Sequence, residues 1–241
     1  DSDQRARARQ WDVSGVNIAD LETQLKQCRS ARDAPIEARV LNRMGLVLCE
    51  RGDMRKGIDT LSRAVASARL CPDRRALLSC LCNLACAHCK SGGRKLAMEV
   101  LEEAVAVAQR MQDPVAEADC LRKMALAQAA DGDIAQALVT SEEVLALYTS
   151  ASHKFGEAAS WFSIGVMKYE LGETVEGVSD VEESLTIRRT MKDKIGISES
   201  LNRLGLALID IGFSLQALDY LERTLALCQE VGDLRGQAHT L

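Results

Sequence analysis

The sequence repeats itself with a period of 40 residues, and this feature restricts its fold more than any other. The segment LNRMGLVLCERG at 41–52 returns as LNRLGLALIDIG at 201–212. Self-similarity at a fixed period of this length is the signature of proteins built from stacked units. The same glycine closes the segment in every copy, at Gly52, Gly92, Gly132, Gly172 and Gly212, and a small residue precedes it by seven positions, at Gly45, Ala85, Ala125, Gly165 and Gly205.

The period divides the chain into five full copies with a partial copy at each end. The full repeats are predicted at about 34–73, 74–113, 114–153, 154–193 and 194–233. Residues 17–33 match the second half of a unit, and residues 234–241 match the start of a sixth. We therefore expect 1–241 to be one array, cut from a longer protein. Uncapped ends of such an array expose apolar surface and favour self-association.

Each unit is predicted to be a helix, a tight turn and a second helix. In the first copy, Leu41, Gly45 and Leu48 are three or four residues apart, which is the apolar stripe of one helix. Gly52 then fits the left-handed conformation that commonly follows a helix end. Neither helix can bury its stripe alone, so neighbouring units must stack. The second helix has its own stripe at Gly57, Ile58, Leu61, Ala64 and Val65.

Residues that typically start a helix recur at the same 40-residue spacing. An aspartate can cap the first free backbone N–H groups of a helix, and a proline is tolerated at the first helical position. Pro114 has that position after Asp113. The predicted caps of the first helices are Asp33, Asp73, Asp113, Asp193 and Asp233, with His153 as the one exception.

Composition favours an all-α protein and excludes several classes of function. Hydrophobic residues make up 47% of the chain but aromatic residues only 3%, as expected for closely packed helices. The net charge of −5 and the interspersed charges argue against nucleic-acid binding. No apolar stretch approaches the roughly 20 residues of a membrane span, and no signal peptide is apparent. The nine cysteines are expected to be reduced, which places the protein in the cytoplasm or the nucleus.

These residues resemble the tetratricopeptide repeat (TPR). The Leu/Trp, apolar and Gly/Ala pattern of the first helix matches it over roughly residues 17–241, with a period of 40 instead of the usual 34. Among long-repeat subclasses, the segment 201–238 looks like the Pins/LGN family of polarity scaffolds, and less closely like kinesin light chains. The resemblance implies a right-handed α-solenoid whose inner wall is built from first helices.

The resemblance also implies which side chains line the concave wall. The central line carries no asparagine, which argues against the carboxylate clamp that binds chaperone tails in some TPR proteins. The rim is partly basic and is opposed by Asp119 and Glu199. The predicted groove residues are Leu46, Cys86, Leu126, Val166 and Leu206 on the central line, flanked by Asn42, Cys82, Arg122, Phe162 and Asn202 on one side, by Cys49, Cys89, Ala129, Tyr169 and Ile209 on the other, and by Arg39, Arg43, Lys123 and Arg203 at the rim.

An apolar line on a solvent-facing wall is not explained by folding, because large exposed apolar patches mark interaction sites. We hypothesise that the groove binds an extended or helical peptide that is apolar with some acidic residues. Two alternatives remain. A helix of the same protein could fill the groove, or tight curvature could close it.

The segment CLCNLACAHCK at 80–90 is locally unusual. Cys82, Cys86 and Cys89 lie on one helical face, and Cys49 of the preceding unit would be the natural fourth ligand of a zinc ion. The favoured interpretation is that these cysteines act as small hydrophobic residues. No metal or other cofactor is predicted. A metal site or an oxidation switch is kept as an alternative.

No constellation of residues indicates catalysis. The adjacent glutamates at 102–103, 142–143 and 182–183 do not face each other on a helix. The segment SGGRKLA at 91–97 lacks the residues of a phosphate-binding loop. The chain is therefore predicted to be a non-enzymatic scaffold or adaptor. The alternative is a regulatory repeat module of a larger enzyme or of a G-protein-signalling regulator.

Overall fold

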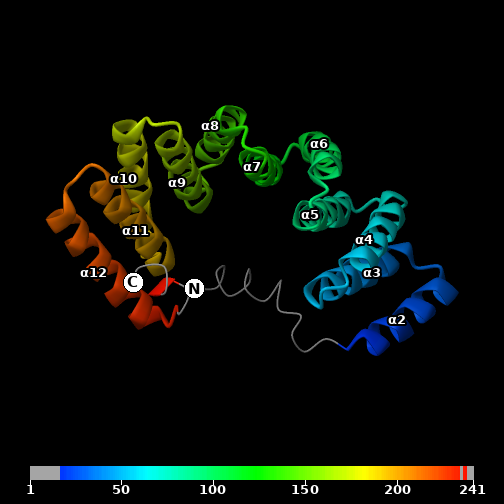
Figure 1. Ribbon diagram of the computed structural model, residues 1–241. Coiled ribbons are helices and arrows are strands. Elements are labelled where there is room, and N and C mark those ends of the chain that lie inside the picture. The colour runs from blue at the N-terminus through cyan, green and yellow to red at the C-terminus, as the bar shows by residue number, and fades with distance from the viewer. Residues whose placement is uncertain (1–16, 234–235, 238–241) are drawn as a thin grey trace. The chain divides into compact units, whose positions relative to one another are not determined.

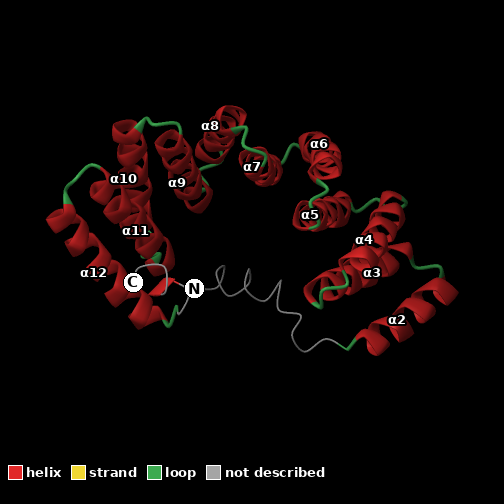
Figure 2. Cartoon of the chain, in the orientation of Figure 1, coloured by secondary structure: helices red, strands yellow, loops and turns green. Residues whose placement is uncertain are grey.

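Two helices per 40 residues form the fold, as the repeat predicts. The structure is a computed structural model that describes residues 17–233 and 236–237. Within these residues there are eleven α-helices and no strand (Figure 1, Figure 2). The helices are α2 (Ile18–Ala31), α3 (Ala34–Glu50), α4 (Met54–Arg69), α5 (Arg74–Lys90), α6 (Arg94–Met111), α7 (Pro114–Ala130), α8 (Ile134–Ser150), α9 (Lys154–Glu170), α10 (Thr174–Thr190), α11 (Lys194–Asp210) and α12 (Ser214–Val231).

The chain divides into two compact units, Asp1–Gln112 and Asp113–Leu241. The first unit contains α2 to α6 and the second contains α7 to α12. Within each unit, every helix packs against the next one along the chain. The predicted all-α solenoid of stacked helix-turn-helix repeats is confirmed as the fold class.

The predicted caps start the first helices. The Asp33, Asp73 and Asp113 carboxylates each accept a hydrogen bond from the backbone N–H three residues later, at 3.0 to 3.1 Å. His153 does the same through Nδ1, which accepts from the Gly156 N–H at 3.0 Å. The histidine therefore replaces the aspartate without loss of the cap. The same bond begins α11 after Asp193, and the Asp233 carboxylate accepts from the Gly236 N–H at 3.0 Å.

The recurring glycines end the first helices in the left-handed conformation. Gly52 has a φ of 88° and Gly212 a φ of 86°, with the other three between these values or close to them. A side chain is strained at such angles, whereas glycine adopts them freely. This explains why the glycine never varies among the five copies.

Small residues set how closely the two helices of one repeat approach. In the α9–α10 pair, Gly165 and Gly177 face each other, and a Cβ atom on either residue would lie 2.6 Å from the carbonyl oxygen of the other. The α5–α6 pair has Ala85 and Ala97 at the same positions, and both are buried. The fourth repeat is therefore packed around a backbone-to-backbone contact that alanine does not fit.

We expect Gly177→Ala to lower the free energy of unfolding by about 1–2 kcal/mol. The added methyl group must displace backbone atoms, and this overpacking outweighs the gain in helix propensity. Urea unfolding followed by circular dichroism measures the change. Ser179→Ala, at an exposed position of the same helix, is the control and should change stability by less than about 0.5 kcal/mol. A Gly177→Ala variant as stable as the wild type would contradict the close contact.

In two repeats, a large residue near the end of the second helix is matched by a glycine in the next repeat. Tyr148 and Arg188 are both buried near the end of a second helix, at the repeat position that holds Cys28, Ala68, Ala108 and Cys228 elsewhere. Each is followed eight residues later by a glycine, Gly156 or Gly196, whose missing side chain leaves room for the large one. Where the first residue is Ala68 or Ala108, the second is an alanine as well.

Candidate functional site

The predicted groove residues lie on the first helices, α3 and α5 in the first unit and α7, α9 and α11 in the second. The central line is accessible to solvent at every position. Leu126 is 50% exposed and Leu206 is 40% exposed, while Leu46, Cys86 and Val166 are half-buried. A face that leaves apolar side chains partly in water in every repeat has unused contact area.

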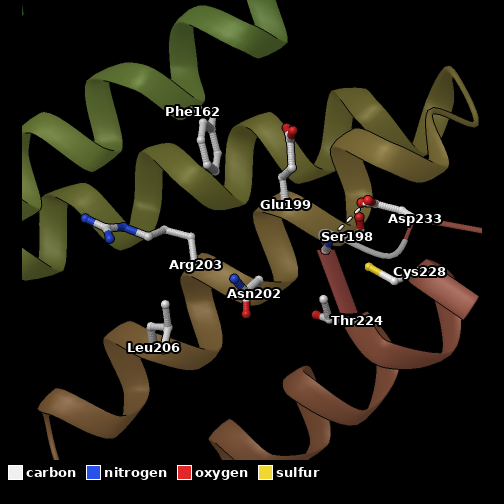
Figure 3. A pocket seen from close by; sticks show the side chains of 10 residues that line it. Phe162, Ser198, Glu199, Asn202, Arg203, Leu206, Thr224, Cys228 and Asp233 are labelled. Atoms are coloured by element: carbon white, nitrogen blue, oxygen red, sulfur yellow. Dashed lines mark hydrogen bonds between the residues drawn. The ribbon is translucent and has the colours of Figure 1, made fainter. Parts of the chain in front are cut away.

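In the second unit, part of this face borders a pocket of about 460 Å³. Four predicted groove residues line it: Phe162 from α9 and Asn202, Arg203 and Leu206 from α11 (Figure 3). Glu199, predicted at the rim, lines it too. The sequence did not indicate the rest of the lining, which comes from the start of α11, from α12 and from the residues after it. These are Ser198, Thr224, Cys228, Asp233 and Gly236.

Two polar atoms of the pocket residues are buried without a hydrogen-bond partner. They are Oδ1 of Asn202 and Nε of Arg203. Buried polar groups are normally hydrogen-bonded, so this pair is unusual. The amide oxygen can accept from an N–H group and the guanidinium can donate to a carbonyl or a carboxylate.

Arg203 does not extend into solvent at the rim. Its guanidinium lies over the Tyr169 ring at 4.5 Å from the ring centroid, an arrangement favoured by cation–π attraction. Burial lowers the pKa of Arg203, and the nearby Glu170 carboxylate opposes this shift. Tyr169 and Arg203 therefore form one surface feature shared by α9 and α11.

The rim carboxylates are already used within the fold. The Tyr148 hydroxyl donates to the Asp119 carboxylate at 2.6 Å. Burial raises the pKa of Tyr148 well above its ordinary value, and the Asp119 carboxylate raises it further. Lys123 donates to the backbone oxygen of Asp119 at 3.2 Å. Glu199 accepts from Arg188 at 3.1 Å. The sequence pattern placed these residues on the rim but did not reveal their partners.

In the first unit, an amide contact joins a groove residue of α3 to a buried residue of α5. The Asn83 side chain donates to Oδ1 of Asn42 at 3.0 Å. Arg39 and Arg43 are exposed on α3. Asn42 therefore helps to position the two helices in addition to bordering the predicted groove.

The cysteine-rich segment does not form a metal centre. In the part of the chain that the structure describes, no three or more His, Cys, Asp or Glu side chains come together to hold an ion. Burial raises the pKa of Cys49, partly offset by the Lys90 charge. Burial also raises the pKa of Cys80 to about 12, with a smaller effect from Cys71. Among the four predicted ligands, this shift at Cys49 disfavours the thiolate that metal binding and oxidation require.

Over the described residues, no helix is both long enough and apolar enough to cross a bilayer.

Family comparison agrees with the repeat fold. Residues 36–110 match the family model of the tetratricopeptide repeat, and residues 146–208 match that of anaphase-promoting complex subunit 5. No curated protein matches the chain. The chain has the fold of tetratricopeptide-repeat proteins, with a period longer than usual.

Solved structures with the same fold have low sequence identity to the chain. BtubC (BKLC) from P. vanneervenii is 17% identical with a TM-score of 0.77, over 90% of this chain and 91% of that one. A kinesin light chain-like protein of Podosopora anserina with nearly identical TPR-like repeats is 20% identical with a TM-score of 0.66, over 83% and 98%. The Rap conjugation gene regulator of plasmid pLS20, in complex with the Phr* peptide, is 11% identical with a TM-score of 0.70, over 95% and 60%. None of these bears on the Pins/LGN resemblance, which stays a prediction.

Proposed function

We propose that the chain is a scaffold or adaptor that binds an extended or helical segment of a partner protein on the exposed face of its first helices. The observation that carries this proposal is the half-exposed line of Leu126, Val166 and Leu206, which repeats on α7, α9 and α11. Burying such side chains contributes about 25 cal/mol for each Å² removed from water. The line therefore offers affinity that the fold itself leaves unused.

Polar groups beside this line favour a particular ligand chemistry. Asn202 and Arg203 line the pocket beside Leu206, and Arg122 and Lys123 lie close to Leu126 on α7. A segment with apolar side chains and some acidic residues satisfies both features. The Rap regulator, which has this fold, is itself in complex with a peptide. This parallel supports peptide binding here without identifying the partner.

We expect Leu126→Glu with Val166→Glu to weaken binding of groove-directed peptides at least tenfold. Each substitution replaces an apolar contact with a charge that must be desolvated on binding. The test selects peptides from a random display library on immobilised wild-type protein and then measures their affinities by fluorescence anisotropy. Circular dichroism verifies that the variants remain equally helical.

The matched control is Leu96→Glu with Val139→Glu. These substitutions add the same charge at two exposed apolar positions of second helices. Peptides that bind this control but not the groove variant support the proposal. If every selected peptide binds the groove variant as well as the wild type, the groove is not the binding site and the proposal is wrong.

A further inference from the structure

A second exposed apolar surface lies outside the groove, at the turns of the fourth and fifth repeats. We define the hairpin-tip patch as Leu171, Val175, Ile211, Phe213 and Leu215. All five are exposed, with Val175 at 78%, Phe213 at 53% and Leu215 at 87%. They lie in or just after the α9–α10 and α11–α12 turns, which share one edge of the second unit in Figure 1.

The other repeats show that this patch is not a requirement of the fold. At the positions of Ile211, Phe213 and Leu215, the first repeat has Arg51, Asp53 and Arg55. The second repeat has Ser91, Gly93 and Lys95, and the third has Asp131, Asp133 and Ala135. These repeats form the same turn with polar or small residues. A function other than folding must therefore account for the apolar side chains.

Stacking of further repeats does not account for them either. The equivalent positions in the first four repeats remain exposed or half-buried although a following repeat is present in the array. Arg55, Lys95, Ala135 and Val175 are all exposed. Leu215 would stay exposed in the same way if another repeat were packed against α12. These side chains are therefore available to a separate molecule.

Phe213 carries a further local penalty. It is the N-cap residue of α12 and makes no side-chain cap. At the same repeat position, Asp53 accepts from the Lys56 N–H and Asp133 accepts from the Gln136 N–H, whereas Gly93 and Glu173 make no side-chain cap either. Replacing a good N-cap by an apolar residue typically costs about 1 kcal/mol. What sets Phe213 apart is that a large aromatic side chain is exposed at this position, which favours a role in contact with another molecule.

The charge around the patch identifies the kind of partner. Residues 169–179 and 205–216 contain Glu170, Glu173, Glu176 and Asp210, all exposed, and no lysine or arginine. Asp219, further along α12, is already paired with Arg223 at 3.0 Å. The nearby Lys168 ammonium is paired with Asp180 at 2.8 Å. An acidic rim disfavours an anionic membrane surface and favours a positively charged ligand.

We propose that the hairpin-tip patch is a second protein-docking surface, separate from the groove, that binds a partner helix whose apolar side chains are flanked by lysine or arginine. Phe213 is its central anchor, since aromatic residues dominate the binding energy of interfaces. The exposed carboxylates pair with the basic flank of the partner. The chain thus carries two surfaces with opposite charge preferences, as a protein that joins two partners requires.

The test measures binding of two fluorescent helical peptides to the full chain by anisotropy. One peptide has leucine at i, i+3 and i+4 spacing and lysine elsewhere, and the other has glutamate in place of lysine. We expect only the leucine–lysine peptide to bind. Ile211→Ser with Phe213→Asn should weaken its binding at least tenfold without any change in net charge. Glu173→Gln with Asp210→Asn should weaken it about two- to fivefold, the effect of exposed charge pairs.

Val139→Ser is the matched control for the apolar substitutions. Val139 is 59% exposed on α8, and the equivalent residue of the next repeat is Ser179. This variant should bind the leucine–lysine peptide like the wild type. Peptides selected for the groove should still bind the Ile211→Ser/Phe213→Asn variant, so failure of the groove proposal and failure of this one are distinguishable. Asparagine at position 213 restores a cap, so the melting temperature should rise by about 2–4 °C.

Three results would overturn the proposal. The first is unchanged affinity of the leucine–lysine peptide for the Ile211→Ser/Phe213→Asn variant. The second is equal binding of the leucine–glutamate peptide. The third is flotation of the wild-type chain, but not of this variant, with phosphatidylserine-containing vesicles while neither peptide binds, which would make the patch a membrane contact.

Discussion

Replacing Tyr148 with alanine should lower the free energy of unfolding by about 3–5 kcal/mol, the usual range for truncating a fully buried aromatic side chain. Tyr148 is only 1% exposed. Its ring stacks on His153 with 5.1 Å between centroids, and its hydroxyl donates to Asp119. Truncation therefore opens a cavity and leaves a groove-rim carboxylate without its donor. Urea unfolding followed by circular dichroism measures the loss.

The role of Gly156 can be separated from this loss by a double-mutant cycle. A methyl group on Gly156 would overlap the Tyr148 ring, so Gly156→Ala alone should destabilise the protein by about 1–3 kcal/mol. In the Tyr148→Ala background the same change should be neutral or favourable, because Ala68 with Ala76 and Ala108 with Ala116 already form such pairs. A coupling energy near zero would show that the glycine is not there to accommodate the ring.

Arg188→Ala should destabilise the fold by about 3–4 kcal/mol, which is close to the effect of removing one member of a buried ionic network. The Arg188 guanidinium is buried and donates to the Gly196 carbonyl oxygen, to the Ser200 hydroxyl at 3.1 Å and to Glu199 at 3.1 Å. It also lies over the Phe162 ring at 4.9 Å. Burial lowers the pKa of Arg188, and the Glu199 and Asp193 carboxylates oppose this shift. Chemical denaturation measures the effect.

Arg188→Met distinguishes hydrogen bonding from packing at this site. Methionine keeps most of the apolar contact with Phe162 but leaves the Gly196 oxygen and the Ser200 hydroxyl without a donor, so we expect a loss of about 1–2 kcal/mol. A methionine variant as stable as the wild type would mean that the hydrogen bonds contribute nothing. A methionine variant as unstable as alanine would mean that packing over Phe162 contributes nothing.

Tyr148 and Arg188 both connect the stability of the fold with the candidate groove. Tyr148 holds Asp119 on α7, and Arg188 contacts Phe162 and Glu199, two residues that line the pocket. Variants at these positions should therefore affect groove peptides as well as folding. This is why the groove test uses Leu126 and Val166, whose side chains are partly exposed and make fewer contacts within the fold.

The sequence by itself determined the repeat, the all-α fold class, the first-helix caps and the glycine turns. Each of these depends on bonds between residues close in the chain or on apolar positions at a fixed spacing. Asp33 caps the N–H three residues away, and Gly52 turns the chain through its own φ angle. Neither therefore depends on contacts with another repeat. Leu126 and Leu206, which the TPR resemblance implies as groove residues, lie on first helices and are half-exposed. That they bind a partner stays a proposal.

Only the tertiary structure decided which side chains are used within the fold and which remain available. Asp119 and Arg203 were both predicted at the groove rim, but Asp119 accepts from Tyr148 of α8 and Arg203 stacks on Tyr169 of α9. The exposure of Phe213 likewise depends on what surrounds the α11–α12 turn in space. A periodic pattern encodes contacts that all repeats share, whereas these contacts arise where one repeat differs from the others. Which of these contacts form depends on side chains that meet only after the helices have packed.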